Sequence, residues 1–346
     1  MSNKVIVFIA SILSTIFIFN SCKQAEDDTL FIESFVFVNE VPETFLFPMD
    51  TGIIEVRSTY HKTPNTIYYK EGDDYIIDRK SNTIQRTATS RIPNYYNHPL
   101  FQKTIEDQDY GPDSVWKNTK YFAYVAYRTE NNTFIADSSD QSTFLKNTKQ
   151  KLASGKSINI CWYGDSVTSG GEASDQKLSF TFIYEQHLRS LYPKAKIESN
   201  NISIPGYGTP EAVSWFDDKF SNQNPDIVFI GFGLNDQSDE GTAACDPDVF
   251  KQNLILLAKK IKEKFSADVV FFSTFPPNDR WNHNTHRMDQ YAAASKQAAR
   301  ETNSAYIDVY GTWMKVLSNK KQEALLSNNI NPPNDFGHWI YAQSFK

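Results

Sequence analysis

The chain has 346 residues, of which 40% are apolar and 22% are charged, an ordinary composition for a folded protein of one or two domains. Its formal charge is -6, and no long cluster of Lys and Arg interrupts the sequence. Nucleic-acid binding is therefore disfavoured, because it requires a cationic surface.

The N-terminus carries an export signal. Lys4 provides a positive start, and the following stretch to Phe19 is almost entirely apolar but too short to span a bilayer comfortably. Phe19-Asn-Ser-Cys22 resembles a bacterial lipobox, in which the Cys is acylated and becomes the mature N-terminus. We therefore expect a signal peptide over residues 1–21 and an acylated Cys22. A polar tether follows over residues 22–28. The expected location is the cell envelope, anchored at the outer membrane or its surface without spanning it; the alternative is secretion.

Residues 29–140 have the pattern of a small all-β domain. Short segments rich in Tyr, Ile, Val and Thr are separated by turn formers, with no helical periodicity between them. This texture predicts a β-sandwich-like domain. The expected strands are Ile53–Thr59, Thr66–Tyr69, Tyr75–Asp78, Thr83–Arg86 and Tyr121–Arg128.

The texture changes near Gln141. We expect a linker helix within residues 141–156, and then a catalytic domain over residues 157–346 in which strands and helices alternate. The expected strands are Ile158–Tyr163, Ile197–Ile204, Asp226–Gly231, Val269–Thr274 and Ala305–Val309. The expected helices are Phe180–Leu191, Pro210–Phe220, Pro247–Phe265, Arg287–Thr302 and Trp339–Phe345.

This alternation predicts an α/β fold, a three-layer α/β/α sandwich on a parallel sheet, preceded by the smaller all-β domain. Most of the expected strands are continuous apolar runs, as is typical of parallel strands covered on both faces. Ligands of such sheets bind beyond the carboxyl ends of the strands.

A candidate nucleophile stands at one such end. The strand Ile158–Tyr163 runs directly into Gly164-Asp165-Ser166. A Ser on a tight turn can expose its hydroxyl, and the Gly relieves crowding there. Gly-Asp-Ser alone would also fit an ordinary turn or helix cap, but its position after an apolar strand favours a catalytic Ser166.

Serine needs a neighbouring base to attack at neutral pH, and His338 is the best candidate among six histidines. Asp335 lies three residues earlier, so on a helical turn the two side chains can share a face. We expect Asp335 to accept the Nδ1–H of His338 and fix its tautomer. Asp308, at another strand end, is the alternative acid. Activity should then rise with pH as the imidazole loses its proton, within about pH 5 to 8.

The oxyanion formed on attack needs preorganised donors. The candidates are the backbone N–H groups of Ser166 and Gly206 and the side-chain amide of Asn235, each at or just after a strand end. Gly208 is an alternative to Gly206, because Gly206-Tyr-Gly208 leaves the register open.

These blocks, in this order, resemble the SGNH hydrolases, also called GDSL-type esterases. The resemblance covers about residues 150–346 and is strongest at Asn331-Pro-Pro-Asn-Asp-Phe-Gly-His338 and Gly231-Phe-Gly-Leu-Asn235-Asp236. It implies a three-layer α/β/α fold, acyl-ester cleavage by a Ser-His-Asp triad, and no metal or organic cofactor. Thr168 follows the Ser where the α/β-hydrolase elbow has Gly, which also fits this family.

Other conspicuous residues have structural interpretations. His283 and His286 could suggest a metal pair, but no carboxylate or Cys joins them in the sequence, so we expect no metal site. Cys161 reads as a buried thiol, and its pairing with Cys245 is left open. Three aromatic residues of the β-domain could stack on sugar rings or form a β-core: Tyr95, Tyr96 and Trp116.

The leading hypothesis is a serine esterase that removes O-acetyl groups from an acetylated poly- or oligosaccharide. An exported, lipid-anchored enzyme with an aromatic-rich β-domain resembles bacterial polysaccharide deacetylases, although fold alone does not set the substrate. The first alternative is a lysophospholipase- or thioesterase-like lipid esterase, which the polar segment Ser169–Lys177 disfavours. The second is a non-catalytic glycan-binding lipoprotein.

Overall fold

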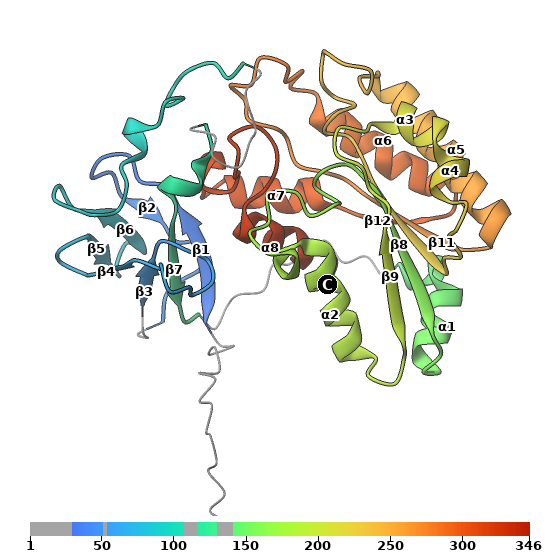
Figure 1. Ribbon diagram of the computed structural model, residues 1–346, viewed down its shortest axis with the longest axis horizontal. Coiled ribbons are helices and arrows are strands. Elements are labelled where there is room, and N and C mark those ends of the chain that lie inside the picture. The colour runs from blue at the N-terminus through green and yellow to red at the C-terminus, as the bar shows by residue number, and fades with distance from the viewer. Residues whose placement is uncertain (1–29, 51–53, 107–115, 130–140) are drawn as a thin grey trace, which may run out of the picture.

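The computed structural model describes residues 30–50, 54–106, 116–129 and 141–346. The expected signal peptide, Cys22 and the tether lie outside these ranges. Within them, no helix combines the length and the apolar character that crossing a membrane requires. Figure 1 shows an all-β part, coloured blue to teal, beside a larger part built on one central sheet.

The β-domain contains two antiparallel sheets, as predicted. One has the strand order β1-β7-β3-β4 and the other β2-β6-β5. Apolar side chains from both sheets belong to one buried core, which continues into the catalytic domain. Its strands are β1 (Phe31–Phe35), β2 (Glu43–Thr44), β3 (Glu55–Arg57), β4 (Tyr68–Tyr69), β5 (Tyr75–Asp78), β6 (Thr83–Arg86) and β7 (Ala123–Tyr127).

The second part is a parallel five-stranded sheet with the order β12-β11-β10-β8-β9. Its three middle strands are almost wholly buried, because helices cover both faces. The strands are β8 (Ile158–Gly164), β9 (Ile197–Asn201), β10 (Ile227–Gly231), β11 (Asp268–Phe272) and β12 (Ala305–Ile307).

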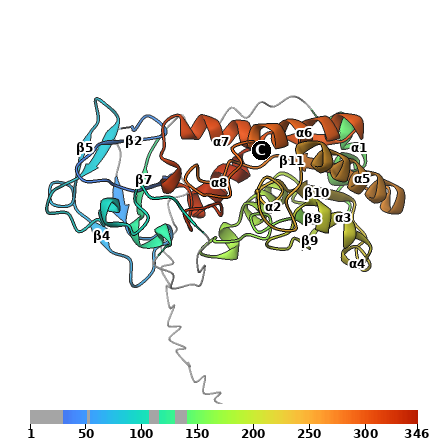
Figure 2. The same cartoon turned by 90° about the horizontal axis from the view of Figure 1, so that it is seen from above.

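The helices form the two outer layers. Figures 1 and 2 show α2 and α8 on one side of the sheet and α3, α5 and α6 on the other. They are α1 (Lys146–Ala153), α2 (Phe180–Leu191), α3 (Thr209–Ser214), α4 (Phe216–Lys219), α5 (Pro247–Phe265), α6 (Met288–Glu301), α7 (Val309–Leu317) and α8 (Asp335–Gln343). The α/β/α architecture is confirmed.

Three helices differ from the sequence prediction. The expected Pro210–Phe220 helix is split into α3 and α4 at Trp215. Helix α7 was missed, because the expected strand ran to Val309; Asp308 instead caps α7 by accepting the Gly311 N–H at 2.9 Å. Helix α8 begins at Asp335 rather than at Trp339, since Asn334 caps it through the Gly337 N–H.

The β-domain packs directly on the C-terminal segment of the catalytic domain. The ring of Phe31 meets those of Phe336 and Trp339 edge to face. The buried carboxylate of Glu33 pairs with Lys320 at 3.1 Å. Burial raises the pKa of Glu33 and lowers the pKa of Lys320, while the charge of each group opposes the shift of the other. The segment that carries the predicted base is therefore enclosed by both domains.

Candidate active site

The nucleophile turn starts where β8 ends. Gly164 lies opposite Gly231 of β10, and a Cβ on Gly164 would lie 2.3 Å from the Gly231 carbonyl oxygen and from Thr168 Oγ1. Only a glycine at position 164 allows the two segments to approach so closely. This requirement determines where the chain leaves β8 and turns toward Ser166. Ser166 follows at the carboxyl edge of the sheet and is half-buried.

Ser166 keeps its reactive atoms free. Its carbonyl oxygen accepts hydrogen bonds from the Gly171 N–H and the Ser169 hydroxyl, both at 2.8 Å. Among the described residues, neither its backbone N–H nor its Oγ has a hydrogen-bond partner. The hydroxyl and the N–H are thus available to a substrate, while the carbonyl anchors the turn.

The candidate oxyanion donors lie at neighbouring strand ends. The N–H of Gly208 donates to Glu211 Oε2 at 3.1 Å, whereas the N–H of Gly206 has no partner in the described part of the chain. Gly206 has a φ of 82°, which favours glycine. The amide of Asn235 donates to the Tyr207 carbonyl at 2.8 Å, which leaves one of its two N–H groups free. This bonding favours Gly206 over Gly208 as a donor.

The structure corrects the expected environment of His338. Its Nε2 lies 3.1 Å from the Gly171 carbonyl oxygen, which can only accept, so Nε2 carries the proton. Its Nδ1 accepts the Phe180 N–H at 3.4 Å, and its ring stacks on Phe180. Both nitrogens are therefore occupied, and among the described residues no hydrogen bond joins His338 to Ser166.

The structure does not show the expected hydrogen bond between Asp335 and His338. The Asp335 carboxylate accepts the Ser174 N–H at 2.8 Å and the Ser174 hydroxyl at 2.7 Å. Helix α8 places the two residues one turn apart, and both contact the loop after the nucleophile, Asp335 at Ser174 and His338 at Gly171. Sequence reasoning missed Ser174 and Gly171 as the partners, because both belong to a distant loop without a motif.

Burial also changes the protonation of the imidazole. His338 is fully buried, which lowers its pKa from 6.5 to about 4. Burial raises the pKa of Asp335, although the hydrogen bonds from Ser174 oppose that shift. The expected titration of His338 between about pH 5 and 8 is therefore moved to more acidic pH.

Two further carboxyls support the strand ends. Asp165 accepts the Val167 N–H at 3.0 Å, and Asp236 accepts the N–H and hydroxyl of Thr209 at 2.7 and 2.6 Å. Burial raises their pKa values to about 7 and about 6. Both hold backbone at the edge of the site and do not reach Ser166.

The remaining candidates have structural partners. His283 lies 2.9 Å from both Asp239 and Glu240. Among the described residues, no group of three or more His, Cys, Asp or Glu side chains is arranged so that it could hold a metal ion. Cys161 and Cys245 are free thiols.

Of the three aromatic candidates, only Tyr96 is well exposed. Tyr95 is buried and its hydroxyl donates to Asn118 and Asn329, so it cannot stack on a sugar. Trp116 is half-buried against the cluster of Leu100, Ile105 and Ile330, whereas Tyr96 exposes 57% of its surface.

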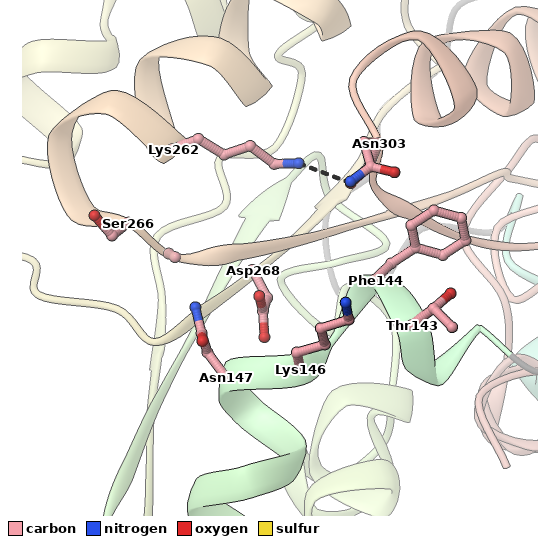
Figure 3. A pocket seen from close by; sticks show the side chains of 9 residues that line it. Thr143, Phe144, Lys146, Asn147, Lys262, Ser266, Asp268 and Asn303 are labelled. Carbon is pink, nitrogen blue, oxygen red and sulfur yellow. Dashed lines mark hydrogen bonds between the residues drawn. The ribbon is translucent and has the colours of Figure 1, made fainter.

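Two cavities of about 330 and 360 Å³ lie at the amino ends of the strands, opposite Ser166. Figure 3 shows the first, where Lys262 donates to the Asn303 carbonyl at 2.9 Å above Asp268, the first residue of β11. Catalysis at a strand's carboxyl end cannot use them, so cavity size does not locate the ester site here.

Comparison with known proteins agrees with this architecture. Residues 162–340 match the GDSL-like lipase/acylhydrolase family. An acetylxylan esterase of Geobacillus stearothermophilus is 25% identical over 212 residues, covering 56% of this chain and 94% of that protein. The chain belongs to the GDSL-like lipase/acylhydrolase family, and the protein is a carboxylic ester hydrolase of the GDSL type.

Two solved structures share parts of the fold. The crystal structure of Axe2, an acetylxylan esterase from Geobacillus stearothermophilus, is 24% identical with a TM-score of 0.47, covering 54% of this chain and 92% of that one. A two-domain esterase active on acetylated mannans is 21% identical with a TM-score of 0.49, covering 58% of this chain and 51% of that one.

Proposed function

We propose that the protein hydrolyses O-acetyl esters of a polysaccharide such as xylan or mannan, with Ser166 as nucleophile. The observation that carries this proposal is the free hydroxyl of Ser166 at the carboxyl end of β8. The Ile204 N–H donates to the Gly164 carbonyl at 3.0 Å, which brings the loop with the free N–H of Gly206 to the same edge of the sheet. The similarity to an acetylxylan esterase over 94% of its length supports the acetyl group and the glycan.

In the proposed reaction, Ser166 Oγ attacks the acetyl carbonyl carbon and gives up its proton to a base. The negative charge that develops on the carbonyl oxygen is stabilised by the N–H groups of Ser166 and Gly206 and by the free amide N–H of Asn235. The bond to the sugar oxygen breaks, and that oxygen takes the proton. Water then hydrolyses the acetyl-serine, which releases acetate and restores the hydroxyl.

The base must reach Ser166, and we assign this role to His338 after a local rearrangement. Gly171 accepts the imidazole proton and itself donates to the Ser166 carbonyl, so the imidazole is separated from the nucleophile by one residue. To act as the base, His338 must break its hydrogen bond to Gly171 and carry its proton on Nδ1 instead of Nε2. The Nδ1–H would then donate a hydrogen bond to a carboxylate such as that of Asp335.

This rearrangement has a cost. Each buried polar group that loses its partner costs about 1–3 kcal/mol, so leaving Gly171 and Phe180 costs roughly 2–6 kcal/mol. The rate should fall below that of a preassembled triad by a factor of roughly 30 to 3 × 10⁴. Slow turnover is therefore part of the proposal.

The pH profile follows from the burial of His338. Its pKa of about 4 means that the imidazole is already neutral at mildly acidic pH. We expect kcat/KM for p-nitrophenyl acetate to be flat from about pH 5.5 to 8 and to fall only as pH drops toward about 4. A midpoint near 6.5 would show that the free enzyme holds His338 in a more solvated position than α8 gives it.

Acetate release tests the function itself. Purified protein should liberate acetate from acetylated xylan or acetylated mannan, and should prefer p-nitrophenyl acetate to the octanoate ester. The octanoate comparison is the control for a lipid esterase, which needs a long apolar groove. A marked preference for octanoate would defeat the glycan assignment.

A second function is favoured by one observation. Because both nitrogens of His338 are occupied, the structure as described suits binding of an acetylated glycan without hydrolysis. That function predicts saturable binding of acetylated xylan with no acetate released at any pH, an outcome that excludes the esterase proposal.

A further inference from the structure

The loop after the nucleophile contains a residue in a costly backbone conformation. We define this nucleophile loop as residues 166–174. Glu172 has a φ of 66°, a left-handed conformation that non-glycine residues adopt only when their surroundings hold them there. The contacts of its carboxylate show what holds it.

The main partner of Glu172 comes from the other domain. Lys117, just before β7, places its Nζ 2.9 and 3.0 Å from the two carboxylate oxygens of Glu172. The pair is largely shielded, with side-chain exposures of 12% for Lys117 and 22% for Glu172. Ser327 adds a hydrogen bond to Glu172 Oε2 at 3.3 Å. A shielded ion pair is screened less by salt than a surface pair.

Lys117 is itself fixed by its neighbour Asn118. The backbone N–H of Asn118 donates to the Ser327 carbonyl at 2.8 Å. Its fully buried side-chain amide donates to the carbonyl of Leu326 at 2.8 Å and to Asn329 Oδ1 at 3.2 Å. The β-domain thus holds the C-terminal segment through Asn118 and the nucleophile loop through Lys117.

Fixing Glu172 also fixes Ser166. The adjacent Gly171 donates its N–H to the Ser166 carbonyl at 2.8 Å, and a Cβ on Gly171 would lie only 2.7 Å from that oxygen. A shift of Glu172 would therefore be transmitted directly to the nucleophile turn. Misplacing a reacting group by about 1 Å can cost about 10²-fold in rate.

We propose that Lys117 of the β-domain is a positioning residue of the esterase: through Glu172 it sets the geometry of Ser166, so the β-domain is part of the catalytic unit. This inference rests on the proposed function, and it explains what holds the nucleophile Ser166 in position. The β-domain then cannot be regarded only as a glycan-binding or spacer module.

The test compares Lys117→Met, Glu172→Gln and their double variant in the full chain. The matched control is Lys321→Met, which removes another ion pair between the domains, Lys321 with Glu43, without touching the nucleophile loop. We expect kcat for p-nitrophenyl acetate to fall about 10- to 100-fold in each loop variant, with KM within about 2-fold of wild type. The double variant should fall no further than the single ones, because both remove one interaction.

Lys321→Met should keep kcat within about 2-fold even if its Tm falls as far as that of Lys117→Met. A Lys117→Met variant with wild-type kcat, or one whose loss equals that of Lys321→Met, overturns the proposal. Lys117→Arg should restore most of kcat, since it keeps the charge.

Amide hydrogen exchange separates this inference from the esterase assignment. If wild type hydrolyses no ester, the proposed function fails, but the positioning can still be measured. Exchange of the amides in residues 167–174 should be faster by about 10-fold or more in Lys117→Met and unchanged in Lys321→Met. Equal exchange in both variants shows that Lys117 does not hold the loop.

Discussion

Replacing Ser166 by Ala should reduce acetate release from acetylated xylan by at least about 10⁴-fold while leaving the fold intact. The hydroxyl makes no hydrogen bond to any described residue, so its removal takes away the nucleophile and no structural contact. Because Ser166 is half-buried and Ala fits its turn, Tm should change little.

The matched control is Ser221→Ala, which removes a hydroxyl that bonds only the local Asp218 carbonyl at 2.8 Å. It should keep wild-type turnover. Hydrolysis at the wild-type rate by a correctly folded Ser166→Ala protein would refute Ser166 as the nucleophile.

The second large effect concerns His338. In His338→Gln, the amide can still donate to the Gly171 carbonyl. The hydrogen bond that holds the nucleophile loop is therefore kept, while the base is lost. We expect kcat to fall by about 10²–10⁴-fold with Tm within a few degrees of wild type. The measurement is steady-state hydrolysis of p-nitrophenyl acetate together with thermal unfolding.

His338→Ala provides the comparison. This substitution removes the hydrogen-bond donor to Gly171, leaves the Phe180 N–H without its acceptor, and opens a cavity in a fully buried position. Its unfolding free energy should drop by about 3–5 kcal/mol. If His338→Gln keeps both its Tm and its kcat, His338 only holds the nucleophile loop through Gly171, and it is not the base.

Much of the fold could be predicted because its signals are local. Helices α2 and α5 have the ends that the sequence predicts. Ser179 stands just before the first of them and Pro247 begins the second, and both residue types are common at helix starts. The parallel sheet follows from the alternation of such segments. Helix α7 was missed because the expected strand was continued through Asp308 to Val309. The hydrogen bond that the Gly311 N–H donates to Asp308 shows that the chain has turned into a helix there.

The site was predicted in part, for the same reason. The turn Gly164-Asp-Ser166 and the glycines near Gly206 have local requirements that a sequence can display. The pairing of Asp335 and His338 depends on which loop packs against α8, and that loop supplies Ser174 and Gly171 as stronger partners. Spacing at i and i+3 allows a contact but cannot exclude a competing one.

Lys117 had no signal of its own, because its importance depends on a contact 55 residues away in the chain. The one sequence cue was that Glu172 follows the pair Gly170-Gly171, in a loop that must return toward the core. Contacts between domains of this kind become visible only in the folded structure.

Catalysis requires Ser166 and His338 to meet, although no hydrogen bond joins them in the described part of the structure. The most direct measurement is a crystal structure of the protein after reaction with an organophosphate such as diethyl p-nitrophenyl phosphate. We predict phosphorus on Ser166 Oγ, its oxygen about 3 Å from Gly206 N and Asn235 Nδ2, and His338 Nε2 within hydrogen-bond reach of Oγ. An unmodified Ser166, or an adduct with His338 still donating to Gly171, would contradict the account.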